Sequence, residues 1–92
     1  MQMKLTEWEG SSGKFYCACV DDLGRNSGAW WVPARGLDLP LPQYLKMLYE
    51  DYDASIESTK SGTYIIYWTD QARMRKFKNW ANKYYRDHKV TI

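Results

Sequence analysis

Cysteine and histidine are scarce in this sequence, which limits the chemistry that it can carry. Two of the 92 residues are cysteines and one is a histidine. A small secreted chain that relied on disulfides would usually have four or more spaced cysteines, whereas Cys17 and Cys19 lie at the far edge of disulfide reach in a strand. Tetrahedral zinc needs more ligands than this pair and His88 supply. We therefore expect reduced thiols, no metal site and no cofactor.

Long hydrophobic runs are absent as well. No apolar stretch approaches the roughly 18 residues of a membrane span, and Lys4, Glu7 and Glu9 occupy the region where a signal peptide has its apolar core. A content of 45% hydrophobic and 26% charged residues excludes the disordered and collagen-like classes. The chain is therefore expected to be a soluble, cytoplasmic protein that folds as a single domain over residues 1–92.

Sequence motifs for catalysis are also missing. The chain has no Gly-x-Ser-x-Gly, no Gly-x-x-x-x-Gly-Lys-Ser/Thr, no His-Glu-x-x-His and no Gly-x-Gly-x-x-Gly. His88 lies near the end of an expected helix, where packing or capping is commoner than general-base catalysis. Cys17 and Cys19 lie in the most apolar stretch, where thiols are unreactive. We therefore expect no enzyme and no catalytic residues.

The first part of the chain has the pattern of a β-hairpin. Residues Lys14–Val20 form a near-continuous apolar run, typical of a central strand buried on both faces. Met3–Trp8 alternates weakly and predicts an edge strand, and Glu9–Gly13 is a connection of hairpin length. Ala29–Val32, ended by Pro33, is either a third short strand or an ordered loop.

From Pro40 the hydrophobic period becomes that of a helix. Pro40 and Pro42 suit its first turn, where the missing N–H groups cost nothing. Apolar residues recur every three or four positions and predict one buried stripe. This stripe consists of Leu41, Tyr44, Leu45, Leu48, Tyr49 and Tyr52.

A second hairpin and a second helix complete the order. Ala54–Ser58 and Thr63–Trp68 are expected strands, and Thr69 or Asp70 is the expected N-cap of the last helix. Its apolar stripe consists of Met74, Phe77, Ala81, Tyr84, Tyr85 and His88, with Trp80 at the border. The resulting ββαββα order predicts an α+β two-layer sandwich, a four-stranded antiparallel sheet with both helices on one face.

Charge is distributed unevenly. Residues 1–69 carry six Lys/Arg against nine Asp/Glu, whereas residues 70–92 carry seven against two. Arg73, Arg75 and Lys76 lie in the first turns of the last helix, where the helix dipole makes each cation cost about 0.3–1 kcal/mol. Such a cluster favours binding of an anionic group. The alternative is that Asp70, Glu57 or other nearby acids neutralise these cations.

Aromatic residues are abundant at 16%, with five tryptophans and eight tyrosines. Trp30 and Trp31 point to opposite faces if both are extended, so one of them would leave the core. Beside Arg35, an exposed ring could anchor a protein interface or stack on a nucleic-acid base. The alternative is that these rings cover the open side of the sheet.

Two hypotheses of function follow. The first is a small non-enzymatic interaction protein that docks, monomeric or as a homodimer, on a protein or nucleoprotein partner and has no membrane partner. In size and style the chain is similar to accessory proteins of phages and mobile elements, including inhibitors of host defence systems. The second is direct nucleic-acid binding by the basic last helix, against which the acidic residues 1–69 weigh. The candidate binding residues are Arg73, Arg75, Lys76, Lys83, Arg86, Trp30, Trp31 and Arg35.

Overall fold

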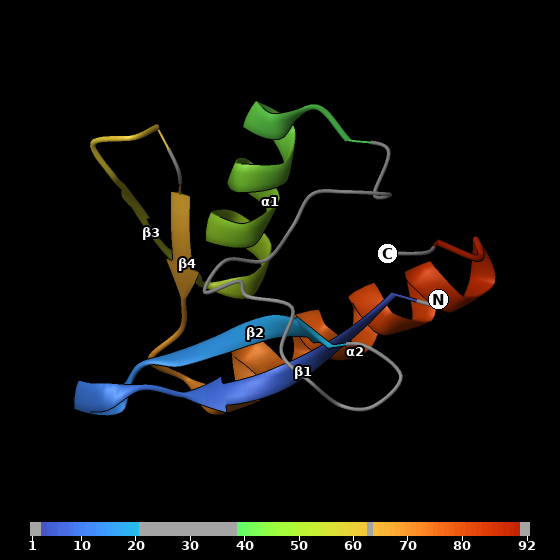
Figure 1. Cartoon of the computed structure of the whole chain (residues 1–92), viewed down its shortest axis with the longest axis horizontal. Coiled ribbons are helices and arrows are strands. Elements are labelled where there is room, and N and C mark those ends of the chain that lie inside the picture. Colours follow the sequence, from blue (N-terminus) through green and yellow to red (C-terminus); the bar gives the residue numbers. More distant parts are fainter. Residues whose placement is uncertain (1–2, 21–38, 63, 91–92) are drawn as a thin grey trace.

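The computed structural model describes residues 3–20, 39–62 and 64–90 (Figure 1). In chain order the elements are β1 (Lys4–Glu9), the 3-10 turn η1 (Ser11–Gly13), β2 (Phe15–Val20), α1 (Leu41–Tyr52), β3 (Ser55–Ser58), β4 (Tyr64–Tyr67) and α2 (Gln71–Asp87). The predicted α+β class and the ββαββα order are confirmed. The predicted short strand or loop at 29–32 lies outside the described residues.

Strands β1 and β2 form an antiparallel hairpin in which Lys4 lies opposite Val20 and Glu9 opposite Phe15. The chain reverses at η1, where Gly13 has a φ of 71°, a conformation that glycine adopts without steric cost. The neighbouring residues Cys17 and Ala18 are both buried, although they point to opposite faces of the strand. The prediction that this strand is covered on both faces is therefore confirmed, and Cys17 carries a thiol and not a disulfide.

Strands β3 and β4 form a second antiparallel hairpin, in which Ser55 lies opposite Tyr67. One residue pair joins it to the first hairpin: Phe15 N–H donates to the Trp68 carbonyl at 2.7 Å, and Trp68 N–H donates to the Phe15 carbonyl at 2.8 Å. Within the described residues, no further residue of β2 pairs with β4. The described residues thus form two two-stranded sheets in place of the predicted four-stranded one. In Figure 1 the two hairpins run in different directions from this junction.

Each helix packs on one hairpin. Helix α2 lies along β1 and β2, α1 packs beside β3, and the two helices contact each other (Figure 1). The predicted arrangement, with both helices on one face of one sheet, is therefore replaced by two helix–hairpin units that share a core. Because α1 is covered along a narrow line only, Tyr44 and Leu48 are buried while Leu41 and Tyr49 of the predicted stripe are 46% and 68% exposed.

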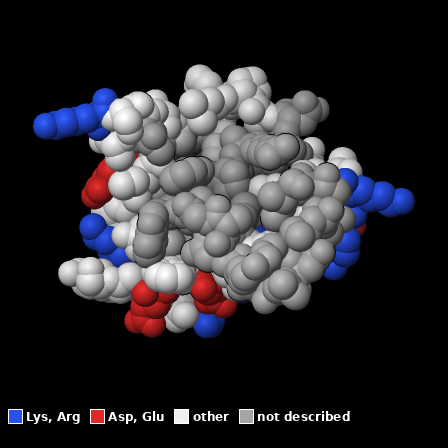
Figure 2. Space-filling model, in the orientation of Figure 1, with Lys and Arg blue, Asp and Glu red and all other residues white. Residues whose placement is uncertain are grey.

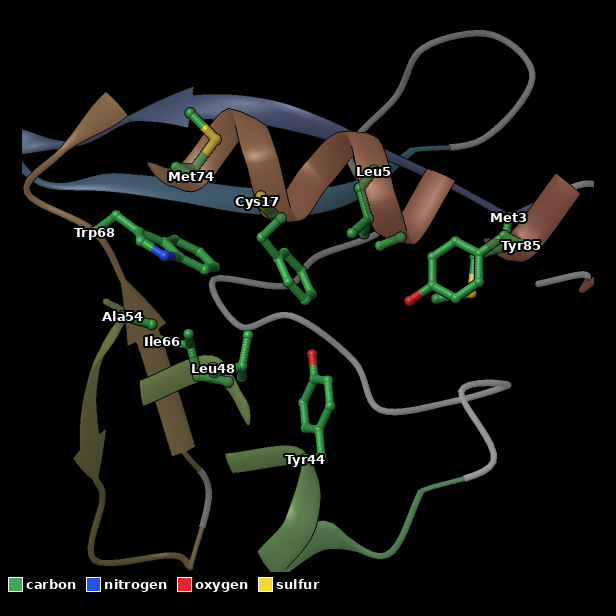
Figure 3. Close-up of a cluster of buried hydrophobic side chains, with 12 residues drawn as sticks. Met3, Leu5, Cys17, Tyr44, Leu48, Ala54, Ile66, Trp68, Met74 and Tyr85 are labelled. Atoms are coloured by element: carbon green, nitrogen blue, oxygen red, sulfur yellow. The ribbon is translucent and has the colours of Figure 1, made fainter. Parts of the chain in front are cut away.

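Trp68 lies where these units meet. Its ring stacks on Phe77 of α2 with the centroids 5.5 Å apart, and its indole N–H donates to the Tyr52 carbonyl at the end of α1 at 2.9 Å. Figure 3 shows Trp68 between α2 and the side chains of Ile66 and Leu48. The buried cluster around it consists of Met3, Leu5, Cys17, Tyr44, Leu48, Ala54, Ile66, Met74, Phe77, Ala81 and Tyr85.

The outer edge of β1 is closed by side-chain and backbone groups from the end of the chain. Leu5 N–H donates to Asn82 Oδ1 at 2.7 Å, and Asn82 Nδ2 donates to the Leu5 carbonyl at 3.0 Å. Met3 N–H donates to the Val90 carbonyl at 2.9 Å. Asn82 therefore takes the place of a neighbouring strand at an edge whose polar groups need partners.

We expect Asn82→Ala to lower the free energy of unfolding by about 2 kcal/mol, because both Leu5 backbone groups would be left without partners in a partly buried place. Asn82→Asp keeps the acceptor and loses the donor, so it should also destabilise. Asn79→Ala, an exposed asparagine on the same helix, is the control and should change stability by less than about 0.5 kcal/mol. Denaturant titration measures all three, and equal midpoints for Asn82→Ala and Asn79→Ala would contradict the bridging role.

Candidate binding site on helix α2

Helix α2 begins with a carboxylate cap supplied by the chain itself. The Asp70 side chain accepts hydrogen bonds from Ala72 N–H at 2.9 Å and Arg73 N–H at 3.4 Å. Asp70, one of the two predicted N-caps, thus satisfies donors at the helix start and brings a negative charge to the positive end of the helix dipole. Arg73 lies in this capped first turn, and the other cations of α2 follow along the helix.

Two of these cations face β1, where they share the single carboxylate of Glu7. Glu7 Oε1 lies 2.9 Å from Arg75 Nε, and Glu7 Oε2 lies 2.9 Å from Lys78 Nζ. The hydrogen bond from Lys78 lowers the pKa of Glu7 most, the bond from Arg75 adds to it, and partial burial opposes both. Glu7 is therefore the nearby acid that the sequence left unidentified. Asp70 caps the helix, and Glu57 instead accepts a hydrogen bond from the Tyr67 hydroxyl at 3.2 Å.

The other cations of the cluster point away from β1. Arg73, Lys76 and Lys83 are exposed, and in the described parts of the chain no acidic side chain forms an ion pair with them. Arg86 lies 3.8 Å from Asp87, and both side chains are largely exposed, so this pair contributes little. The predicted binding residues of α2 thus differ in their partners: Arg75 is paired with Glu7 although its side chain is 53% exposed, whereas Arg73, Lys76 and Lys83 have no ion pair in the described chain.

Beside the exposed cations runs a line of aromatic rings, which we call the α2 ladder. It consists of Phe77, Trp80, Tyr84 and His88, spaced three or four residues apart and therefore on one side of the helix. The centroids of successive rings are 5.9, 5.8 and 3.9 Å apart. Phe77 is buried, Trp80 and Tyr84 are half-buried, and His88 is exposed, so the ladder passes from the core to the surface.

The outer end of the α2 ladder has a fixed geometry. His88 stacks on Tyr84 with an angle of 16° between the ring planes. His88 Nδ1 lies 2.9 Å from the Tyr84 carbonyl, and because a carbonyl oxygen only accepts, Nδ1 carries the proton and donates it. The imidazole is thereby held flat against Tyr84.

A shallow, open groove of about 190 Å³ lies along this part of the helix, and we call it the α2 groove. It is lined by Trp80, Lys83, Tyr84, Asp87 and His88. It therefore combines half-buried aromatic surface with the ammonium group of an exposed lysine. Such a combination can hold a flat, electron-rich ring and an anionic group next to it.

The sequence analysis identified only part of this site. Of the predicted residues, Lys83 lines the groove, while Trp30, Trp31 and Arg35 lie outside the described residues. Tyr84 and His88 were assigned to the buried stripe, but Tyr84 is half-buried and His88 is exposed. The sequence feature that indicates the groove is Trp80, because its predicted position is at the border of that stripe.

Acidic side chains gather elsewhere. In Figure 2 basic side chains lie at the edge where α2 ends and also at the left edge, and acidic ones lie along the lower edge and on the left. Asp51, Asp53 and Glu57, near the junction of α1 and β3, are all exposed. Within residues 3–20, 39–62 and 64–90, no group of three or more His, Cys, Asp or Glu is arranged to hold a metal ion.

The function of this site can be argued only from its own geometry, because the comparisons with known proteins found no match. No family model, curated protein or solved structure matches this chain. Neither helix in the described part of the chain has the length and apolar character that crossing a membrane requires.

We expect Glu7→Gln to lower the free energy of unfolding at pH 7 by about 1 kcal/mol, since it removes one charge from two ion pairs. The folded-state pKa of Glu7 lies below the ordinary 4.5, so its stabilisation is complete above pH 4.5 and is lost as the pH falls through the folded-state pKa. The difference between the two proteins should therefore vanish in acid. Glu9→Gln, on the same strand, is the control in denaturant titrations across pH. A difference of equal size in acid and at pH 7 would contradict the ion-pair role.

Proposed function

We propose that this chain is a small non-enzymatic interaction protein that docks on the nucleic-acid part of a nucleoprotein partner through the side of α2. One observation carries the proposal: Arg73, Lys76 and Lys83 are exposed beside the α2 ladder and have no ion pair in the described chain, whereas Arg75 and Lys78 share the carboxylate of Glu7. Two of these five cations form ion pairs within the fold, and the other three are exposed beside aromatic rings.

A polyanion is the partner that this surface fits best. Phosphate groups that meet lysine and arginine side chains release condensed counterions, which supplies most of the sequence-independent affinity for nucleic acid. Aromatic rings beside the cations add stacking on bases. The exposed acids Asp51, Asp53 and Glu57 would repel a polyanion, so they restrict its approach to the α2 side.

Such binding would inhibit the partner complex by occupying its nucleic acid. A small domain that covers the nucleic acid of a host complex prevents that complex from engaging its target and needs no catalytic group to do so. The hypothesis of a phage or mobile-element inhibitor of a host defence complex, acting in the cytoplasm, is thus part of the proposal. Direct binding to free nucleic acid is the simplest form of the same activity, and it is the one measured first.

The test is binding of labelled single-stranded and double-stranded DNA and RNA, followed by fluorescence anisotropy at about 50 and 200 mM salt. We expect binding that weakens steeply with salt. The variant Arg73→Ala/Lys76→Ala/Lys83→Ala should bind much more weakly, with a salt slope smaller by roughly two to three.

The matched control is Lys4→Ala/Lys46→Ala/Lys60→Ala, which removes three exposed lysines that lie outside α2. It changes the net charge by the same amount and should bind almost as the unaltered protein does. Equal losses in the two triple variants would show that only net charge matters. Absence of binding to every nucleic acid by the folded protein would overturn the proposal.

A further inference from the structure

We infer that the α2 groove is a base-stacking subsite that makes the protein select single-stranded over double-stranded nucleic acid. The inference rests on the proposed function and adds the form of the ligand. Its basis is the arrangement of Tyr84 and His88, a flat pair of rings whose outer member is exposed.

The size of the groove suits one base. Its volume of about 190 Å³ is below the roughly 300–1,000 Å³ of sites that enclose a whole small molecule. The Trp80 and Tyr84 rings are 5.8 Å apart and tilted by 36°, so they do not close face to face. A shallow, ring-lined groove of this kind takes a flat ring laid against it.

His88 completes the stacking surface. Its inner face covers Tyr84 at 3.9 Å, and the Nδ1–H bond to the Tyr84 carbonyl fixes the orientation of the imidazole. Because the side chain is exposed, a base can lie on the imidazole without displacing a protein group. A platform held in place before binding loses little conformational entropy when the base arrives.

The charges around the groove favour a base inside and phosphates beside it. Lys83 lines the groove, and Lys76 lies one helical turn before Trp80, so ammonium groups flank the rings. Asp87 also lines the groove, and its carboxylate repels phosphate but accepts hydrogen bonds from the amino groups of bases. A nucleotide would therefore place its base against His88 and its phosphate at Lys83, while Lys76, about 18 Å from His88 along the helix, would meet a phosphate further along the strand.

Stacking in the groove requires an unpaired base. In a duplex the faces of the bases are covered by their neighbours, so a protein ring reaches them only after unstacking, whereas single strands offer them at once. Cations alone would bind both forms. Selectivity for single strands is therefore the property that separates a base-stacking groove from a basic surface.

The experiment compares a labelled single strand with the duplex of the same sequence, binding to the unaltered protein, His88→Ala and His88→Phe. Loss of one stacked base costs about 1–3 kcal/mol, so His88→Ala should weaken single-strand binding by about five- to 150-fold. His88→Phe keeps a flat ring and should stay within about threefold of the unaltered protein. His88 is exposed, so neither variant removes a core residue.

Each outcome has one meaning. Single-strand preference that is lost in His88→Ala and kept in His88→Phe supports the subsite. Equal affinity for single strand and duplex, or an unchanged affinity of His88→Ala, overturns the subsite while the salt-dependent binding of the proposed function stands. Polyglutamate that binds as tightly as the single strand, independently of His88, would show a surface for acidic proteins and overturn it too. No salt-dependent binding to any nucleic acid overturns both proposals.

Discussion

The rotation of α2 about its own axis is the constraint on which the rest of the structure depends. Burial of Met74, Phe77, Ala81 and Tyr85 turns one side of the helix into the core and thereby fixes where every other side chain points. One flank then faces β1 and the other flank carries the α2 ladder. A rotation of one residue, about 100°, would bury lysines and expose the core, so this arrangement is strongly specified.

The two flanks of α2 differ because β1 lies on one side only. Towards β1, Asn82 pairs with the Leu5 backbone, and Glu7 pairs with Arg75 and Lys78, so polar groups of the helix satisfy those of the strand. On the flank away from β1, no acidic side chain of the described residues pairs with the lysines of α2. This flank presents lysine side chains and aromatic rings. The same segment, which has seven cations, therefore contributes to folding on one side and carries the proposed binding surface on the other.

The sequence predicts local features of this protein well and distant pairings poorly. The buried residues of α2 follow from their spacing and the Asp70 cap from its position, because both depend on neighbours in the chain. The pairing of Glu7 with Arg75 joins residues 68 positions apart, and no local pattern indicates it. The predicted four-stranded sheet is not formed by the described residues for a similar reason: whether two hairpins pair beyond Phe15 and Trp68 depends on how the hairpins are oriented in space, which no local pattern indicates. Of the residues that line the α2 groove, Lys83 is predicted from the sequence as a binding residue, whereas the exposure of His88 is seen only in the structure.

Residues that folding does not need are the clearest guide to function here. Arg73 lies near the positive end of the α2 dipole, where a cation costs a few tenths of a kcal/mol to about 1 kcal/mol, and no ion pair in the described chain compensates it. Lys76 and Lys83 add like charge along the same helix, and His88 presents a ring to water. At position 73 a glutamate would suit the helix better, because the dipole favours an acidic side chain in the first turn. Arg73, Lys76 and Lys83 are exposed and have no ion pair in the described chain, and Lys83 lies with the exposed His88 along the α2 groove, so the proposed binding of a nucleic-acid strand rests on this flank of the helix.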